Sequence, residues 1–466
     1  MNTGMNIKKK RFTPMWSLTI SLAVYLLLLL PTFSGISFVL PEEHFYIVSL
    51  TSLIAAGISY GMGVSGIRLR NLQVLFVALG FISLTIFFTL HGLSTPGFLL
   101  EFNPVVSVSV QMSFLLLSFF LWLSTVPGNN KFISSLGSNN RLLLGGWTLL
   151  LIALSVLFFF RNELILWIPL DSAPLNWIVA LTTLFLSLIA GFRFWRAYQY
   201  TQFSLQAGLA HATALISAAQ VIASTGELWH ISWWLYHFLL LGAVLITVFT
   251  LISQFSFGDT LGLALQGLFT DSPTERIMAG ISPKIKALIV AEEAHDLYTA
   301  GHAQRVALNA IRLGEKVGLS PDELRALAHG SLLHDIGKIS VPNEILNKPG
   351  TLTPDERHEM EKHTLYGYEM CQKLGFMDAE LEIIRWHHER VNGRGYPDVL
   401  TVDKIPALVK IVAVVDIYDA LTSDRAYRKA LSHDQAIQHL DAFSNFALDK
   451  EYVELWKALI GAEFEN

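Results

Sequence analysis

The chain has 466 residues with a formal net charge of −5, and 52% of its residues are hydrophobic whereas only 15% are charged. Because soluble globular domains contain about 25% charged residues, the composition argues against a wholly soluble protein and indicates membrane-spanning segments. No stripe of Lys or Arg interleaved with aromatic residues follows residue 254, which argues against polymeric nucleic acid as a partner. Cys371 is the only cysteine, so neither an intramolecular disulfide nor a four-cysteine zinc site can form.

The first half of the chain is apolar, and residues 12–253 contain only seven Lys or Arg. A transmembrane helix needs roughly 20 mostly apolar residues, and the pattern predicts eight such spans, which makes residues 1–253 a helical, polytopic membrane domain. The predicted spans are 15–40, 45–64, 72–93, 104–126, 142–160, 175–192, 207–224 and 231–255. The seventh is rich in small residues, which favours an interior helix packed against its neighbours.

Basic residues in short loops predict the orientation of this domain, because such loops stay in the cytoplasm. With the N-terminus inside, ten Lys or Arg fall on the inner side and only Arg161 on the outer side. The ten are Lys8, Lys9, Lys10, Arg11, Arg68, Arg70, Lys131, Arg141, Arg193 and Arg196. An even number of spans then places the C-terminal half in the cytoplasm. The expected location is a bacterial inner membrane, with membrane lipid as a partner of the spans. Seven spans would place that half outside, and a removable signal peptide at the "KKKR" start is a further alternative.

Five histidines belong to the predicted membrane half. His44, His91 and His230 are expected near the outer face, where they are either a sensory site for a metal or a proton, or interfacial polar residues at helix ends. His211 and His237 are expected to form hydrogen bonds between helices.

Beyond the membrane half, residues 254–284 mix Gly, Asp, Ser and Pro and are predicted to be a connector. Helical periodicity continues almost throughout residues 285–466, so the fold class is all-α, a helical membrane domain followed by an all-helical cytoplasmic domain.

Two helix starts in this second domain are well marked. Ser320 and Thr353 are each followed by Pro and, three residues on, by Glu, which is the pattern of a capping box. The first helix is expected to carry the pair His334–Asp335 at its C-terminal end, with Gly337 as its cap, and the second to carry His363.

Ten of the fifteen histidines lie between His295 and His439, which concentrates metal-ligand side chains in the second domain. Candidate ligands at or near apolar helix faces are His302, His334, Asp335, His363, His387, His388 and Asp416. The histidines without partners at a useful spacing are assigned no role, namely His295, His329, His358, His433 and His439.

The residue types in this set point to two hydrolytic metal ions. Asp416 stands in the apolar stretch "IVAVVDIYDAL", where a carboxylate must be neutralised, hydrogen-bonded or bound to a cation. The rings of His387 and His388 diverge by about 100° on one helix, so each is expected to face a different ion. Asp335 is expected to bridge both ions. Imidazole and carboxylate without thiolate favour iron or manganese over a structural zinc.

The motifs around these residues resemble those of the HD-GYP family, bacterial phosphodiesterases of cyclic di-GMP within the HD superfamily of metal-dependent phosphohydrolases. The resemblance covers roughly residues 285–466 and rests on "HDIGKISVPNEILNKPGTLTPDERHEMEKH", "HHERVNGRGYP" and "DIYDALTSDRAYRKA". It implies metal ligation by the same seven side chains, a homodimer, and hydrolysis of cyclic di-GMP to pGpG with GMP as a further product.

The resemblance also implies how substrate is held. It assigns phosphate contacts to Lys338, Arg425 and Arg428, and a pocket border to Gly395, Tyr396 and Pro397. Cationic side chains suit a phosphodiester because its negative charge is delocalised. The sequence departs from the family at Asn392, where Asp is usual, and at Tyr298, where some members have a Glu that binds a third ion, so two ions are expected.

Asp335 and Lys338 are accordingly the predicted catalytic residues. Two ions would activate water for attack on phosphorus, and Lys338 would stabilise the negative charge that gathers on the other oxygens. Two alternatives stay open. In the first, the chain is still a metal-dependent hydrolase but its substrate is another cyclic dinucleotide or a nucleotide. In the second, the chain is a non-catalytic nucleotide-binding membrane receptor or transporter.

Overall fold

The computed structural model describes residues 12–68, 71–98, 105–126, 140–167, 170, 172–256, 274, 277–278, 281–295, 301–424, 429–444 and 446–464. These residues are helical apart from turns, loops and the isolated bridges Ser37–His230 and Ser444–Leu448, which confirms the predicted all-α class. The chain divides into two compact units, Met1–Asp271 and Ser272–Asn466. The predicted connector, 254–284, straddles this division and lies largely outside the described residues.

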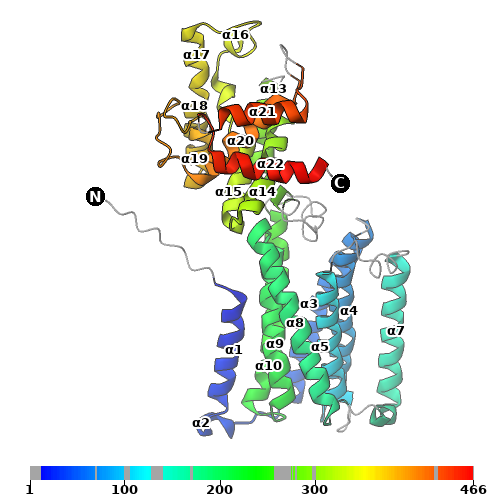
Figure 1. Cartoon of the computed structure of the whole chain (residues 1–466). Helices are drawn as coiled ribbons and strands as arrows, with labels where there is room; N and C mark the ends of the chain where they lie inside the picture. The colour runs from blue at the N-terminus through cyan, green and yellow to red at the C-terminus, as the bar shows by residue number, and fades with distance from the viewer. Residues whose placement is uncertain are drawn as a thin grey trace. The chain divides into compact units, whose positions relative to one another are not determined.

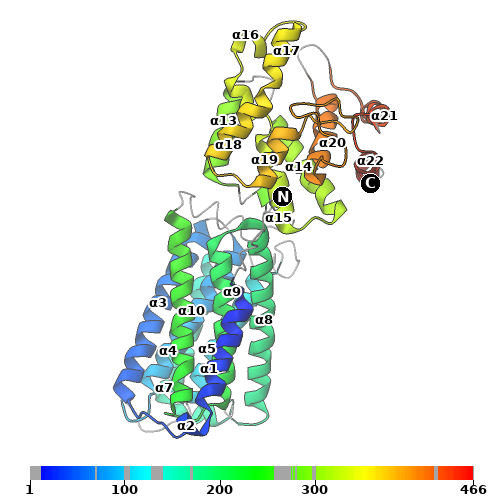
Figure 2. The same ribbon diagram turned by 90° about the vertical axis from the view of Figure 1, so that its left-hand side faces the viewer.

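The first unit is a bundle of long apolar helices that run side by side (Figures 1 and 2). Its elements are α1 (Pro14–Leu28), α2 (Pro31–Ser34), α3 (Pro41–Arg68), α4 (Leu72–Leu93), α5 (Val105–Ser124), α7 (Asn140–Phe160), η1 (Asn162–Trp167), α8 (Leu175–Thr201), α9 (Ser204–Thr225) and α10 (Ile231–Ser256). Seven of these, α3 to α5 and α7 to α10, are long and apolar enough to cross a membrane. The start of α1 and the end of α10 lie at the same end of the bundle (Figure 1).

The first predicted span is shorter than expected. Helix α1 has 15 residues and ends at Leu28, and Leu30 is extended with ψ 148° before Pro31 begins α2. The break follows from chemistry, because a residue that precedes proline is disfavoured in helical geometry. The seventh predicted span, now α9, is largely buried between its neighbours, as its small residues indicate.

The second unit is a compact set of shorter helices. They are α13 (Pro283–His295), α14 (His302–Val317), α15 (Pro321–Leu333), η2 (Ile336–Ser340), α16 (Asn343–Leu346), α17 (Pro354–Glu361), α18 (His363–Lys373), α19 (Asp378–Trp386), α20 (Ala407–Thr422), α21 (His433–Phe443) and α22 (Lys450–Phe464). Helix α20 lies at the core, in contact with α14, α15, α19, α21 and α22. Its residues Val409, Ile411, Val412 and Val414 are fully buried.

Both predicted capping boxes are present, at Ser320 for α15 and Thr353 for α17. The role expected for Gly337 was wrong. Helix α15 ends with His334 in right-handed helical geometry as its C-cap. Gly337 instead allows η2 to approach α18, because a Cβ atom there would lie 1.8 Å from the carbonyl oxygen of His363. His363 is also not on the helix that begins at Pro354, since that helix ends at Glu361 and His363 is the first residue of α18.

Candidate metal centre

Five segments of the second unit bring the predicted ligands together, mostly at helix ends. His302 begins α14, the pair His334–Asp335 joins α15 to η2, and His363 begins α18. The pair His387–His388 directly follows α19, and Asp416 lies within α20. Side chains at helix ends can converge on one point while the helices themselves pack around it.

Asp335 belongs to two groups of side chains whose ligand atoms lie close together. The first group is Asp335, His363, His387 and His388, and the second is His302, His334 and Asp335. Within each group the ligand atoms all lie within 4.8 Å of one another. His387 and His388 fall in the same group, so the expectation that their rings serve different ions was wrong. Because both residues follow the end of α19, the divergence expected within a helix does not apply to them.

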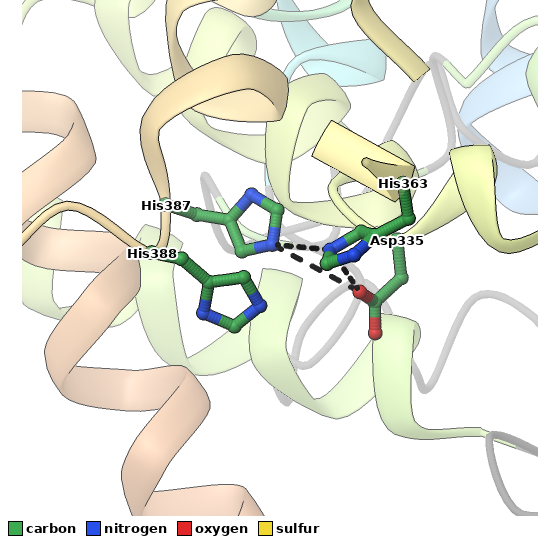
Figure 3. Close-up of side chains that lie close together, drawn as sticks. All are labelled: Asp335, His363, His387 and His388. Atoms are coloured by element: carbon green, nitrogen blue, oxygen red, sulfur yellow. Dashed lines mark hydrogen bonds and ion pairs between the residues drawn. The ribbon is translucent and has the colours of Figure 1, made fainter. Parts of the chain in front are cut away.

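The first group converges on one oxygen of Asp335 (Figure 3). That oxygen, Oδ1, lies 3.4 Å from Nε2 of His363 and 3.9 Å from Nε2 of His387. The two Nε2 atoms are 3.4 Å apart. The ring of His388 lies beside that of His387, with 4.2 Å between their centroids.

The second group uses the other oxygen of the same carboxylate. Oδ2 of Asp335 lies 3.4 Å from Nε2 of His334. Oδ1 of Asp416 lies 3.2 Å from Nε2 of His302 and 3.8 Å from Nε2 of His334, which places Asp416 at the edge of this group. The two oxygens of Asp335 therefore face different sets of imidazoles.

The histidine rings are held by their Nδ1 atoms, which leaves Nε2 facing the centre. Nδ1 of His334 lies 2.7 Å from the carbonyl oxygen of Ser331, and Nδ1 of His363 lies 2.7 Å from that of Met360. Nδ1 of His387 lies 3.0 Å from the carbonyl oxygen of Ile384. A carbonyl oxygen only accepts, so each Nδ1 must carry the hydrogen and each Nε2 a lone pair. Metal-binding histidines are oriented in this way. Nε2 of His334 is buried without a hydrogen-bond partner.

His302 is oriented by Asp419, which the sequence analysis did not select. Nδ1 of His302 donates to Oδ2 of Asp419 over 2.7 Å, and Arg305 donates to both oxygens of the same carboxylate over 2.7 and 3.0 Å. Asp419 is only 3% exposed. The available signal was its position three residues after Asp416, one helical turn along the same face of α20.

A comparison with known protein families covers the same region of the chain as the predicted ligands. Residues 289–451 match the family model described as HD domain. This region is an HD domain.

Relatives of the HD domain are named as phosphodiesterases of cyclic dinucleotides. The domain is 38% identical over 172 residues to a cyclic di-GMP phosphodiesterase response regulator of Xanthomonas campestris, which covers 36% of this chain and 46% of that protein. It is 38% identical over 167 residues to 3'3'-cGAMP-specific phosphodiesterase 2 of Vibrio cholerae, a match that covers 35% of this chain and 32% of that protein. It is 35% identical over 177 residues to a cyclic di-GMP phosphodiesterase of Thermotoga maritima, a match that covers 38% of this chain and 48% of that protein. The match spans less than half the length of each relative. It confirms the resemblance drawn from the motifs.

The electrostatics of the HD domain centre suit a cation. Burial works against the charge of Asp335, but Lys338, whose Nζ lies 2.8 Å from Oδ2, and the nearby imidazoles hold the pKa of this carboxyl well below its usual range. Burial lowers the pKa of His363 and His387, and burial together with His363 lowers that of His388 to about 3. These imidazoles are therefore neutral at physiological pH, as metal ligands must be.

His302 behaves differently. Burial disfavours its charged form, but the hydrogen bonds with Asp416 and Asp419 outweigh burial and raise its pKa to about 10. A cation in this group would replace the proton that Nε2 of His302 shares with Asp416.

The substrate-side residues are described only in part. Lys338 lies at the centre, paired with Asp335. The ring of Tyr396 lies 4.8 Å from that of His388, between centroids. Gly395 passes so close to the Glu389 backbone that a Cβ atom would lie 2.4 Å from its Cα. Arg425 and Arg428, and the position Tyr298, lie outside the described residues.

The loop after the histidine pair is held by a buried carboxylate. Glu389 is 3% exposed, and its two oxygens accept from the backbone N–H groups of Asp398 (2.7 Å) and Leu400 (2.9 Å). This pairing fixes the turn that carries Tyr396 and Pro397 beside the histidines. Asn392 accepts from the N–H of Arg394 over 3.0 Å, so the loop keeps a local turn where the family usually has Asp.

Taken together, the residues present fit divalent metal ions. The donors are imidazole and carboxylate, the Nδ1 atoms of His302, His334, His363 and His387 are occupied by hydrogen bonds, and the Nε2 atoms face a shared carboxylate. Such a donor set suits iron, manganese or zinc.

Proposed function

We propose that the chain is a membrane-anchored, metal-dependent phosphodiesterase that hydrolyses cyclic di-GMP to linear pGpG, with GMP as a further product. The observation that carries the proposal is the position of Asp335, whose two oxygens face two separate groups of imidazoles. A carboxylate shared in this way is the arrangement expected for a pair of ions.

Two ions, iron or manganese, would be held by His302, His334 and Asp416 on one side and by His363, His387 and His388 on the other, with Asp335 common to both. When bound, they supply an activated water molecule and positive charge next to the phosphodiester. The Nδ1 hydrogen bonds keep each ring fixed, so no reorganisation of the ligands is needed during the reaction.

Lys338 supplies a second source of positive charge. Its ammonium group lies 2.8 Å from Asp335, and its side chain is 19% exposed, so it faces the accessible side of the centre. A phosphate oxygen that reaches the centre would replace part of this ion pair. We infer that Lys338 stabilises the charge on the non-bridging oxygens, together with Arg425 and Arg428.

The choice of cyclic dinucleotide is the finer part of the proposal. Relatives of similar identity are named for cyclic di-GMP and for 3'3'-cGAMP, so the HD domain match supports the class and leaves both substrates open. The loop of Gly395, Tyr396 and Pro397 borders the histidines and is where we expect the one base that differs between these substrates to be distinguished.

The membrane domain is proposed to anchor the enzyme with the HD domain in the cytoplasm. Seven helices are long and apolar enough to cross a membrane, and the shorter apolar helix α1 packs along α9 and α10 as an eighth. The start of α1 and the end of α10 therefore lie at the same end of the bundle, which supports an N-terminus and a connector on one side of the membrane. The excess of basic residues in the predicted inner loops favours the cytoplasmic side. The homodimer stays a prediction that a mass measurement of the purified protein would test.

The experiment is hydrolysis by the full-length protein, purified anaerobically in detergent and supplied with Mn²⁺ or Fe²⁺. Cyclic di-GMP, 3'3'-cGAMP and cyclic di-AMP are tested in parallel, with metal content measured on the same samples. Asp335→Ala is expected to lose both metal and activity, whereas His358→Ala, a change at an exposed histidine of α17, retains both. An Asp335→Ala protein with full metal content and activity would contradict the proposal.

A further inference from the structure

A second cluster of histidines lies in the membrane domain. His44, His91 and His237 are 1%, 2% and 0% exposed, and one ring nitrogen of each lies within 4.8 Å of those of the other two. The sequence analysis grouped His44 and His91 with His230 and treated His237 separately. The structure brings in His237, and places His230 apart, beside Glu227.

The three residues come from one end of the bundle. His44 lies in the first turn of α3, His91 in the last turn of α4 and His237 in the second turn of α10. The loop before α3 meets the start of α10, where the N–H of Ile231 donates to the carbonyl of Ile36. This end of the bundle is opposite to the one at which α10 ends.

Two of the rings are locked with a lone pair on Nε2. Nδ1 of His91 lies 2.8 Å from the Val106 carbonyl, which only accepts. Nδ1 of His44 lies 2.8 Å from the Thr95 hydroxyl, and that hydroxyl donates its own hydrogen to the Gly92 carbonyl. Both rings therefore carry their hydrogen on Nδ1 when neutral.

The Nε2 atoms of these two rings face each other. They are 3.2 Å apart, and Nε2 of His237 lies 2.8 Å from Nε2 of His44. Two lone pairs at this distance repel each other, and a cation bound by both nitrogens would remove the repulsion. Three nitrogens around a tetrahedral ion with bonds of about 2.0–2.1 Å would be about 3.4 Å apart. To hold the ion, the His44–His91 pair would therefore open by about 0.2 Å and the His44–His237 pair by about 0.6 Å.

The surroundings provide both shielding and access. Trp229, Trp233 and Trp234 surround His44, with ring centroids 5.2 to 5.9 Å from its own. A cavity of about 130 Å³ is lined by His91, Trp233 and Tyr236 and extends to Leu228, which is 40% exposed. The hydroxyl of Tyr236 lies 3.2 Å from Nε2 of His91 and offers an oxygen ligand beside the three nitrogens.

We propose that His44, His91 and His237 bind a single transition-metal ion of the kind that imidazole prefers, copper or zinc, at the end of the membrane domain where α3 and α10 begin. Within the part of the chain that the structure describes, no carboxylate or thiol belongs to this group. The ligand set therefore differs from the HD domain centre, which contains carboxylates. An imidazole-only set suits copper and zinc.

The test measures metal bound per chain by the full-length protein in detergent, after removal of metal with a chelator and dialysis against Zn²⁺ in one arm and Cu⁺ under reducing conditions in the other. Three variants test the cluster: His44→Gln, His91→Gln and His237→Gln. With the ion that the cluster binds, Zn²⁺ or Cu⁺, each variant is expected to bind one ion per chain fewer than the wild type. The matched control is His211→Gln, which changes a membrane histidine that contacts Ser17 instead of the cluster and should bind as many ions as the wild type. Equal binding by the wild type and all three cluster variants, in both arms, would overturn the proposal.

Two further measurements separate this site from the HD domain centre and from misfolding. The loss of one ion on changing His44 should persist in a protein that also carries Asp335→Ala, because that change acts only on the HD domain. If the cluster variants aggregate, Asp335→Ala with an intact cluster is heated with and without Zn²⁺ or Cu⁺. An increase in the unfolding temperature of its membrane domain is expected, and no increase with either ion would also refute the site.

Discussion

The role of Asp419 gives the sharpest test of the HD domain centre. Asp419→Asn keeps the size of the side chain but leaves one acceptor oxygen where the carboxylate has two. The carboxylate now accepts from Nδ1 of His302, from two nitrogens of Arg305 and, over 3.3 Å, from the hydroxyl of Ser423. An amide oxygen in the place of Oδ2 could still accept from Nδ1 of His302 and from Nη2 of Arg305, but the amide N–H groups would then face Nε of Arg305.

The residue that the remaining oxygen faces decides how the substitution affects metal binding. If the oxygen faces Arg305, the amide N–H groups face His302, whose Nδ1 must then give up its hydrogen, so that Nε2 is protonated and cannot bind metal. If the oxygen faces His302, the amide N–H groups oppose the guanidinium. The side chain of Arg305 is 46% exposed and water can compensate it, whereas that of His302 is 9% exposed, so the oxygen is expected to face His302. The loss in metal affinity then comes from the missing negative charge, because a carboxylate behind the imidazole makes it a stronger ligand.

Changes to such a partner of a metal ligand typically reduce affinity or activity about 10- to 100-fold, which corresponds to about 1.4 to 2.8 kcal/mol. We expect this loss in Mn²⁺ affinity, measured by competition with a chelator, and a parallel loss of cyclic dinucleotide hydrolysis. The control is Asp441→Asn, which removes an exposed carboxylate paired with Lys457 over 2.7 Å. An Asp419→Asn protein with wild-type Mn²⁺ affinity would refute the orienting role of Asp419.

Three further outcomes are expected. Gly337→Ala should lower the unfolding temperature and the metal content, because the added Cβ atom would collide with the backbone of His363. The control, Gly461→Ala in α22, has open space around it and should stabilise the protein by about 0.5–1 kcal/mol. Equal stability of the two variants would contradict this reasoning. Glu389→Gln should destabilise the loop by about 1–3 kcal/mol, since one backbone N–H loses its acceptor, and raise the KM for the substrate; an unchanged KM would count against the loop. Removal of metal with a chelator should abolish hydrolysis and lower the unfolding temperature, with both restored by Mn²⁺; hydrolysis that survives metal removal would contradict a metal-dependent mechanism.

The features of the HD domain that could be predicted were those that depend on residues close together in the sequence. The capping boxes at Ser320 and Thr353 depend on residues three positions apart, and both helices begin there. The ligands could be selected because His or Asp interrupts apolar stretches. The role of Asp419 depends on contact with His302, 117 positions away in the sequence. Its position one helical turn after Asp416 places it on the same helix face, but gives no sign of which residue it contacts.

The membrane domain shows the same limit. Its helices follow from apolar length alone, but which histidines meet depends on how each helix is rotated. His230 precedes α10 and lies beside Glu227, whereas His237 lies within α10 and faces the interior. Similarly, the approach of η2 to α18 at Gly337 could not be read from the sequence, where a glycine after His-Asp equally indicates a helix cap.

The charges of the two histidine clusters explain why they should hold different ions. In the HD domain, Asp335 and Asp416 bring two negative charges to the ligand set, and they can offset much of the charge of two divalent ions in a buried site. The membrane cluster consists of neutral imidazoles, so the full charge of an ion there would face apolar surroundings, offset only by the faces of the nearby indoles. This favours a singly charged ion such as Cu⁺, or Zn²⁺ with Tyr236 ionised as an additional ligand. The comparison of Zn²⁺ with Cu⁺ therefore tests the electrostatic argument as well as the existence of the site.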